Sequence, residues 1–168
     1  MAKVTLDAPG GAEAVFSPPP ATSLDRTLTY RLHLLHKLTD QASHRIYPRI
    51  TGLSLSDGRC LATVGAFEPL SVNDLARRAN LTKGQASRAA QSLVDQQLIG
   101  KSDHPEDGRG VVLTLTAHGR HTWLQTMALI AQRNEEIFGC LSPLEHTQLS
   151  RMFDQLIAHV LGQAEQSA

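Results

Sequence analysis

The sequence predicts a mainly α protein in which two short helices and a β-hairpin are flanked by longer helices. Three observations lead to this prediction: two closely spaced helix starts at Ser71 and Thr82, a change from helical to alternating periodicity after Gln97, and apolar stripes of helical period near both ends. The chain has 168 residues, of which 41% are hydrophobic and 19% charged. It is therefore long and apolar enough to fold around a substantial core.

The N-terminal segment divides into an arm and two helices. Residues 1–22 are rich in glycine and proline, which disfavour helix and sheet, so we expect a flexible arm. Apolar residues then recur at three- and four-residue steps, which predicts an amphipathic helix over 24–47 that Pro48 ends. A short helix that begins with a cap at Ser56 and stops near Gly65 is expected next.

The next two helix starts are marked by capping residues. Ser71 is followed three positions later by a carboxylate, and Thr82 is followed by Gln85, which completes a capping box. These signals predict helices over 71–79 and 83–97 that are separated by a short turn. This is the spacing of a helix-turn-helix.

Extended structure and another helix follow. Leu98 and Ile99 lead into the polar segment 100–103, the turn residues of 104–110 follow, and Val111–Thr116 is alternating and β-branched, which together predict a two-stranded hairpin. Thr116 then caps a helix over 117–138, which Gly139 ends. The apolar side of this helix is expected to comprise Trp123, Met127, Ile130, Asn134 and Ile137.

The last helix has the strongest start signal in the chain. Ser142, Pro143 and Glu145 combine an N-cap, a first-turn proline and a capping-box carboxylate. Its apolar stripe is larger than one small domain covers, so we expect a second subunit to cover it in a homodimer. The stripe comprises Leu149, Met152, Phe153, Leu156, Ile157, Val160 and Leu161.

Charge and cysteine content limit the class of protein. Basic and acidic residues both number 16, which excludes a uniformly basic protein but allows a local basic face. The two cysteines, Cys60 and Cys140, show no pairing pattern, and neither a secretory signal nor a membrane-spanning apolar run is present. We therefore expect a reduced, cytoplasmic protein without a membrane segment.

Polar side chains on the second helix of the motif suit DNA. Cations, amides and hydroxyls at its outward positions can bind phosphates and base edges. A merely solvated helix face is the alternative, but the alanine-rich inner side lets this helix lie close on its support and favours the DNA interpretation. The expected contacts are Lys83, Gln85, Ser87, Arg88 and Gln91. In the hairpin, Arg109 can reach an adjacent minor groove, although a lone hairpin arginine is usually a solvated charge.

Four segments closely resemble the MarR family of bacterial transcriptional regulators, over about residues 24–162. They are LSVNDLARRANLTKGQASR at 70–88, LVDQQLI at 93–99, DHPEDGR at 103–109 and LTLTAHG at 113–119. The resemblance implies a MarR-type domain over 23–168, with a winged helix-turn-helix lobe at 53–119. The dimerisation helices would lie at 24–50 and 120–165.

The resemblance also implies how the protein binds DNA. The recognition helix would enter the major groove of a pseudo-palindromic operator, and the wing pair Asp107 and Arg109 would act at the minor groove. Many members have a second arginine where this chain has Gly108. Wing binding is therefore expected to be weaker than is usual in the family.

A small-molecule effector is implied as well, since many MarR relatives leave DNA when an aromatic acid binds between the dimerisation helices and the DNA-binding lobe. We expect a repressor that responds to a small aromatic carboxylate or its CoA thioester. The candidate contacts are Tyr30, Arg31, His33, His36 and Arg59. Each of these side chains could instead form a hydrogen bond across the dimer or be exposed to water, without contacting an effector. Cys60 could line the same cavity but is more typical of a buried hydrophobic residue.

Other functions are less favoured. The histidine pairs 33/36 and 118/121 could bind zinc, but no cysteine or acidic cluster accompanies them. A redox sensor would need a stabilised thiolate, and near Cys60 only Arg59 offers this. An enzyme is disfavoured because the sequence has no nucleophile with a suitably spaced base, no phosphate-binding glycine loop and no paired carboxylates. No cofactor, catalytic residue or metal site is expected.

Overall fold

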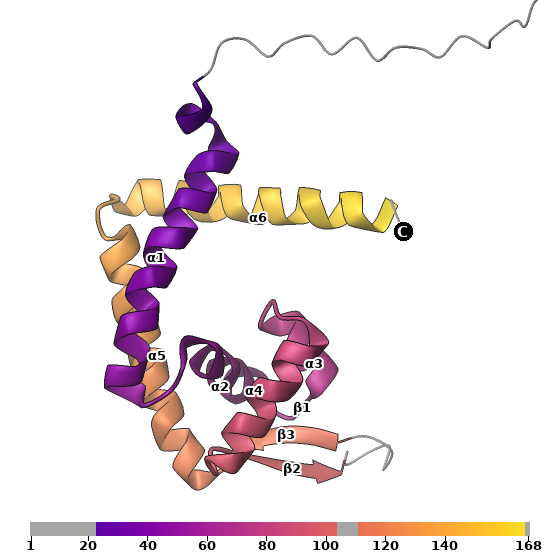
Figure 1. The fold of residues 1–168 in the computed structure, drawn as a ribbon. Coiled ribbons are helices and arrows are strands. Elements are labelled where there is room, and N and C mark those ends of the chain that lie inside the picture. Colours follow the sequence, from indigo (N-terminus) through magenta and orange to yellow (C-terminus); the bar gives the residue numbers. More distant parts are fainter. Residues whose placement is uncertain (1–22, 104–110, 167–168) are drawn as a thin grey trace, which may run out of the picture. The chain divides into compact units, whose positions relative to one another are not determined.

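The computed structural model describes residues 23–103 and 111–166 (Figure 1). Residues up to Lys37 and residues from Leu38 onward form two compact units, and each is described by itself. The expected arm at 1–22 and the wing residues Asp107 and Arg109 lie outside the described residues.

The first helical segment differs from the prediction at both ends. A short 3-10 helix, η1 (Leu24–Arg26), is separated from α1 (Leu28–Thr51) by extended backbone at Thr27. Pro48 lies inside α1 and does not end it. A proline costs the helix only one backbone donor, which the last turn tolerates. The same turn gains a hydrogen bond from the Thr51 hydroxyl to the Tyr47 carbonyl. Gly52, with a φ of 72°, follows the end of the helix.

Helix α2 (Leu55–Phe67) is longer than predicted. Its N-cap is Ser54 and not Ser56, because the Ser54 hydroxyl accepts the Asp57 N–H at 3.0 Å. Gly65 does not end the helix either. A Cβ there would lie 2.4 Å from Nε1 of Trp123, so this glycine makes room for an indole ring.

The helix-turn-helix is confirmed. It consists of α3 (Val72–Arg78) and α4 (Lys83–Asp95), joined by a turn in which Asn80 has a φ of 54°. The hydroxyl of Ser71 accepts the Asp74 N–H at 3.1 Å, and the capping box at the start of α4 is complete. Helix α4 ends two residues earlier than predicted.

The hairpin is part of a three-stranded antiparallel sheet. Strand β2 (Ile99–Asp103) pairs with β3 (Val111–Leu115), as predicted, and β1 (Leu70–Ser71) pairs with the other side of β3. Strand β1 was not predicted from the sequence, because a strand of two residues shows no periodicity. Together the elements confirm a mainly α, winged helix-turn-helix fold.

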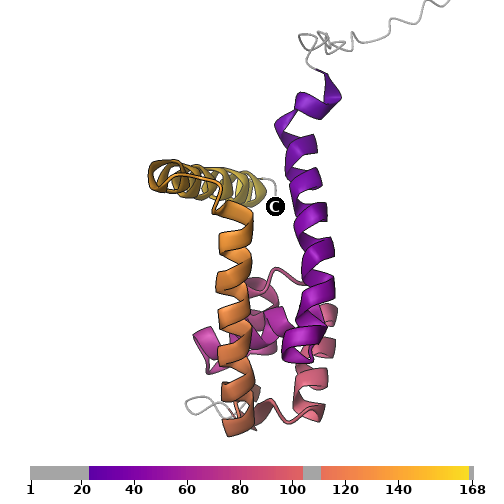
Figure 2. The same ribbon diagram turned by 90° about the vertical axis from the view of Figure 1, so that its left-hand side faces the viewer.

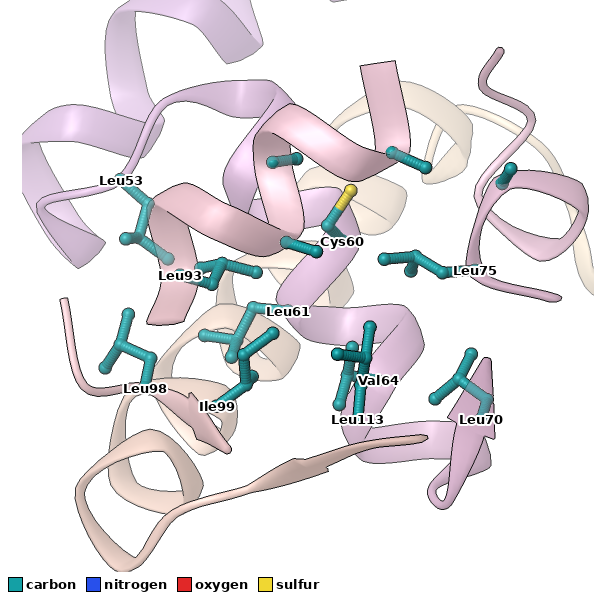
Figure 3. Packing of buried hydrophobic residues seen from close by; sticks show 14 residues of the cluster. Leu53, Cys60, Leu61, Val64, Leu70, Leu75, Leu93, Leu98, Ile99 and Leu113 are labelled. Carbon is teal, nitrogen blue, oxygen red and sulfur yellow. The ribbon is translucent and has the colours of Figure 1, made fainter. Parts of the chain in front are cut away.

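The core of the lobe lies between α2, α3, α4 and the sheet (Figure 3). Leu61, Val64, Leu75, Leu93 and Leu113 are completely buried in it. Alanines on the inner side of α4 are also buried, so the backbone of α4 lies close to the core. This packing fixes which side of α4 remains outside.

Cys60 is part of this core and is fully buried, as expected for a small hydrophobic residue. Burial, together with the nearby Asp57 carboxylate, raises the pKa of its thiol from 9.0 to about 12. The unfolded thiol ionises first as the pH rises, so the free energy of unfolding should fall between these two values.

We predict that Cys60 does not react with thiol reagents in the folded protein. In a Cys140→Ser chain, Ellman's reagent at mildly alkaline pH should release no colour until denaturant is added, and then one equivalent. Thiol reactivity needs an accessible thiolate, which burial of Cys60 denies. Rapid labelling of the native chain would contradict the buried position.

Helix α5 (Ala117–Phe138) begins and ends as predicted, with Thr116 as N-cap and Gly139 as C-cap. Its buried side differs from the prediction. Thr122, Thr126 and Leu129 are buried, whereas Met127 and Asn134 are exposed. Small residues on this side allow α5 to pack closely on α2, and the Trp123 Nε1–H donates to the carbonyl of Ala62 at 3.3 Å.

Helix α6 (Pro143–Gln166) projects from the end of α5 (Figure 2). Its predicted start is confirmed. The Ser142 N–H donates to the Glu145 carboxylate at 2.8 Å, and the Ser142 hydroxyl accepts the backbone N–H of Glu145. Most of the stripe is exposed in the single chain, from Phe153 at 36% to Val160 at 60%. None of the helices described is long and apolar enough to span a bilayer.

Candidate DNA-binding surface and ligand pocket

Helix α4 presents a polar outer side because its alanine side is buried. The five residues expected to contact DNA on this helix, namely Lys83, Gln85, Ser87, Arg88 and Gln91, are all exposed. Two of them already have defined partners. The carbonyl oxygen of Gln85 accepts the N–H and the hydroxyl of Thr82, both at 2.9 Å. Gln85 therefore also fixes the start of the helix.

A recess of about 310 Å³ lies beside the outer side of α4. Arg88 and Gln85 line it from α4, and Ser56 and Asp57 line it from α2. The Ser92 hydroxyl donates to the Asp57 carboxylate at 3.1 Å. This hydrogen bond links α4 to α2 next to the proposed DNA-contacting residues.

Gln91 joins α4 to the wing. Its side-chain carbonyl accepts a hydrogen bond from Nζ of Lys101, on β2, at 2.7 Å. Its side-chain N–H donates to Asp95 at 2.7 Å. Sequence reasoning did not select Lys101, because a single lysine in a strand carries no distinctive signal.

The base of the wing is tied to α5 by Glu68. This carboxylate accepts the backbone N–H of Leu115 at the end of β3 and pairs with Arg120 of α5 at 2.6 Å. The side chain of Glu68 is only 19% exposed, so the charge pair is partly shielded from water. Through Glu68, the end of β3 is therefore linked to the first turns of α5.

A second cavity, of about 320 Å³, lies between the C-terminal half of α1, α2 and α5, and is called the ligand pocket below. Its wall combines apolar and polar side chains, as is typical of small-molecule sites. The lining residues are Ser43, Tyr47, Leu55, Arg59, Ile130, Arg133, Asn134, Ile137 and Phe138.

The two arginines of the ligand pocket differ in exposure. Arg59 is 46% exposed and forms an ion pair with Asp40 at 2.6 Å. Arg133 is only 14% exposed; its Nη1 pairs with Glu136, and its Nη2 donates to the Thr39 carbonyl at 3.5 Å. The Nε of Arg133 is buried and has no hydrogen-bond partner among the described residues.

Tyr47 lines the same pocket as these two arginines and lies within reach of both charges. Its ring packs against Gly58, where a Cβ would approach to 2.4 Å, and the residue is 4% exposed. Burial raises the pKa of its hydroxyl, and the positive charges of Arg59 and Arg133 oppose part of this shift. The hydroxyl therefore remains protonated at neutral pH and can donate a hydrogen bond.

Of the residues that the sequence analysis proposed as effector contacts, Arg59 lines the ligand pocket. Tyr30, Arg31, His33 and His36 are exposed on the first part of α1 and are not among its lining residues. Tyr47 and Arg133, which also line the ligand pocket, were not selected from the sequence. Their signal was weak, because both lie in amphipathic helices where a tyrosine or an arginine is ordinary.

Metal binding was a secondary alternative in the sequence analysis. Within residues 23–103 and 111–166, no three histidine, cysteine, aspartate or glutamate side chains come together as a candidate metal site.

Comparisons with known proteins agree with this geometry. Residues 51–110 match the MarR family model. The chain is 26% identical to the HTH-type transcriptional repressor Rv2887 of Mycobacterium tuberculosis, over 62% of this chain and 76% of that protein. A MarR/EmrR family regulator from Acinetobacter shares the fold with a TM-score of 0.75 at 21% identity, over 83% of this chain and 98% of that structure.

Two further solved structures were described with small acids. One is Bordetella bronchiseptica BpsR, whose DNA binding is regulated by 6-hydroxynicotinic acid. It matches with a TM-score of 0.72 at 18% identity, and the match covers 82% of this chain and 97% of the BpsR chain. Rv2887 in complex with p-aminosalicylic acid has a TM-score of 0.62 at 22% identity, over 77% of this chain and 98% of that one.

Proposed function

We propose that the protein is a MarR-family DNA-binding regulator, and specifically a homodimeric repressor that a small aromatic carboxylate releases from its operator. As a regulator of this kind, it is not an enzyme. Its operator would be pseudo-palindromic, with two half-sites about one helical turn, or roughly 10 base pairs, apart.

Support for DNA binding comes from the outer side of α4. Cation, amide and hydroxyl side chains are exposed there, on a helix whose buried alanines hold it close to the core. Lys83, Gln85, Ser87 and Arg88 are the proposed contacts in the major groove. The wing pair Asp107 and Arg109, at the minor groove, remains a prediction from the sequence.

We predict that Arg88→Ala weakens operator binding by about 1–3 kcal/mol, and that Arg109→Ala also weakens it. Fluorescence anisotropy with a duplex selected by the protein from random sequence would measure both. Arg151→Ala, on the polar side of α6, is the matched control and should bind like the parent. Parent-like binding by both lobe variants would show that the proposed contacts are wrong.

The single observation that carries the effector proposal is the side chain of Arg133, which lines the ligand pocket, is 14% exposed, and has a buried Nε–H without a hydrogen-bond partner among the described residues. A buried donor without a partner costs about 1–3 kcal/mol. A carboxylate is the acceptor that suits a guanidinium edge best, and the Tyr47 hydroxyl nearby can donate a further hydrogen bond. Apolar residues of the pocket, such as Ile130 and Phe138, would contact the ring.

Cavity size favours the free acid over its CoA thioester. At about 320 Å³ the ligand pocket is at the lower end of the range of small-molecule sites. The ligands of the two structural relatives described with small acids, hydroxynicotinic and aminosalicylic acid, are single-ring acids. A one-ring aromatic carboxylate is therefore the proposed effector class.

We predict that Arg133→Met lowers the affinity for the acid at least tenfold while operator binding without ligand stays close to that of the parent. Loss of one partner from a partly buried charge pair commonly costs roughly 2–5 kcal/mol. Calorimetry with benzoate, salicylate, hydroxynicotinate, cinnamate and their CoA thioesters would identify the ligand. The same titration then compares the variant with the parent.

Arg31→Met is the informative control. If Tyr30, Arg31, His33 and His36 hold the effector, as the sequence analysis predicts, Arg31→Met should reduce ligand affinity and Arg133→Met should not. If the ligand pocket holds the effector, Arg133→Met should reduce ligand affinity and Arg31→Met should not. A parent protein that binds none of these acids would contradict the proposed effector class.

A further inference from the structure

Gln91 was expected from the sequence to contact DNA, but its side chain is held between two charged residues of the lobe itself. The Asp95 carboxylate can only accept hydrogen bonds, and the Lys101 ammonium can only donate them. The amide of Gln91 is therefore oriented by chemistry, with its N–H toward Asp95 and its carbonyl oxygen toward Lys101, both at 2.7 Å.

The position of Lys101 follows from the register of the sheet. Lys101 lies directly opposite Leu113 in the β2–β3 pair, so the two side chains leave the same face of the sheet. Leu113 is completely buried in the core of the lobe, whereas Lys101 is exposed. The stem of Lys101 thus starts on the face covered by helices, and its charged end reaches solvent beside α4.

This geometry puts a positive charge at the junction of α4 and the wing. A duplex that runs from a recognition helix in its major groove to a wing at its minor groove passes this junction, where its phosphates are the nearest groups. We propose that Lys101 is a phosphate contact and that Gln91 is a positioning residue that holds the Lys101 ammonium toward the duplex. The inference rests on DNA binding by the lobe, and not on the effector.

Salt dependence of binding to a mixed-sequence duplex tests this proposal without knowledge of the operator. The slope of log K against log salt is negative, and its magnitude, called the slope below, should fall by about 0.9 for each phosphate that the protein no longer neutralises. Lys101→Met should therefore lower this magnitude, and Lys101→Arg should restore it. Gln91→Met should lower the slope as Lys101→Met does, and the double variant should be no worse than either single variant. Lys37→Met, in α1 and outside the lobe, is the matched control.

Each alternative has a distinct result. An unchanged slope for Lys101→Met, in a variant whose melting temperature matches the parent, would overturn the phosphate contact. If Gln91→Met loses selectivity for a selected operator over the mixed duplex and keeps the parent slope, Gln91 reads a base. Additive effects in the double variant would overturn the positioning role. A parent that binds no duplex would refute DNA binding itself, whereas failure of the effector proposal leaves these measurements unaffected.

Discussion

Replacement of Gly119 by alanine should destabilise the protein by about 3 kcal/mol or more. A Cβ at this position would lie 1.7 Å from the carbonyl oxygen of Leu98, which is backbone and cannot move aside as a flexible side chain can. The same carbonyl accepts the N–H of Thr116, so a shift would also disturb the start of α5. Thermal unfolding should show a loss of about 6–12 °C in melting temperature.

Gly84→Ala is the matched control for this prediction. Gly84 is also in the first turn of a helix, but a Cβ there would meet nothing closer than the Arg88 guanidinium at 3.7 Å. Alanine at an unstrained helical glycine typically stabilises by about 0.4–1 kcal/mol. Equal melting temperatures for the two variants would contradict the close packing of α5 against Leu98.

Two lysines on the apolar stripe of α6 should convert the proposed dimer into monomers. Leu156 and Val160 are 59% and 60% exposed in the single chain and lie on one side of the helix. In a two-fold interface each residue occurs twice, so Leu156→Lys with Val160→Lys removes four apolar side chains, worth about 6–12 kcal/mol if fully buried. Sedimentation at micromolar concentration should show twice the chain mass for the parent and the chain mass for the variant.

Operator binding should fall with the dimer, because one chain presents one recognition helix to a two-fold operator. Ala158→Lys adds one lysine to the opposite side of α6 and should leave mass and binding as in the parent. Its exposed position makes the substitution tolerable for the helix itself. A doubly substituted variant that remains dimeric would place the interface elsewhere, and a monomeric parent would refute the dimer.

Helix starts were predictable because capping is local. The hydroxyls of Ser71, Thr82, Thr116 and Ser142 each accept a backbone N–H three residues further on, and all four N-caps were assigned from the sequence. The cap of α2 was misplaced because Ser54 and Ser56 are both chemically suitable. Ser54 is the cap because Leu55, the first residue of α2, is buried against Tyr47 and Leu129. This contact depends on the tertiary structure and not on the local sequence.

Contacts between distant residues could not be predicted in this way. The ligand pocket joins Tyr47 of α1, Arg59 of α2 and Arg133 of α5, which are far apart in the sequence and share no spacing rule. The same holds for the link between Gln91 and Lys101, which depends on strand register. The effector candidates predicted from the sequence therefore lie mainly among the neighbouring polar residues of α1, and only Arg59 of them lines the ligand pocket.

The helix-turn-helix, the hairpin and the apolar stripe of α6 could be predicted from the sequence, because each depends on periodicity or on hydrogen bonds between residues three or four positions apart. Three features could be read only from the folded chain: the buried side of α5, the continuation of α1 past Pro48, and the pairing of β1 with the sheet. These features depend on partners distant in the chain, whose burial and hydrogen bonding override the local preference of a residue.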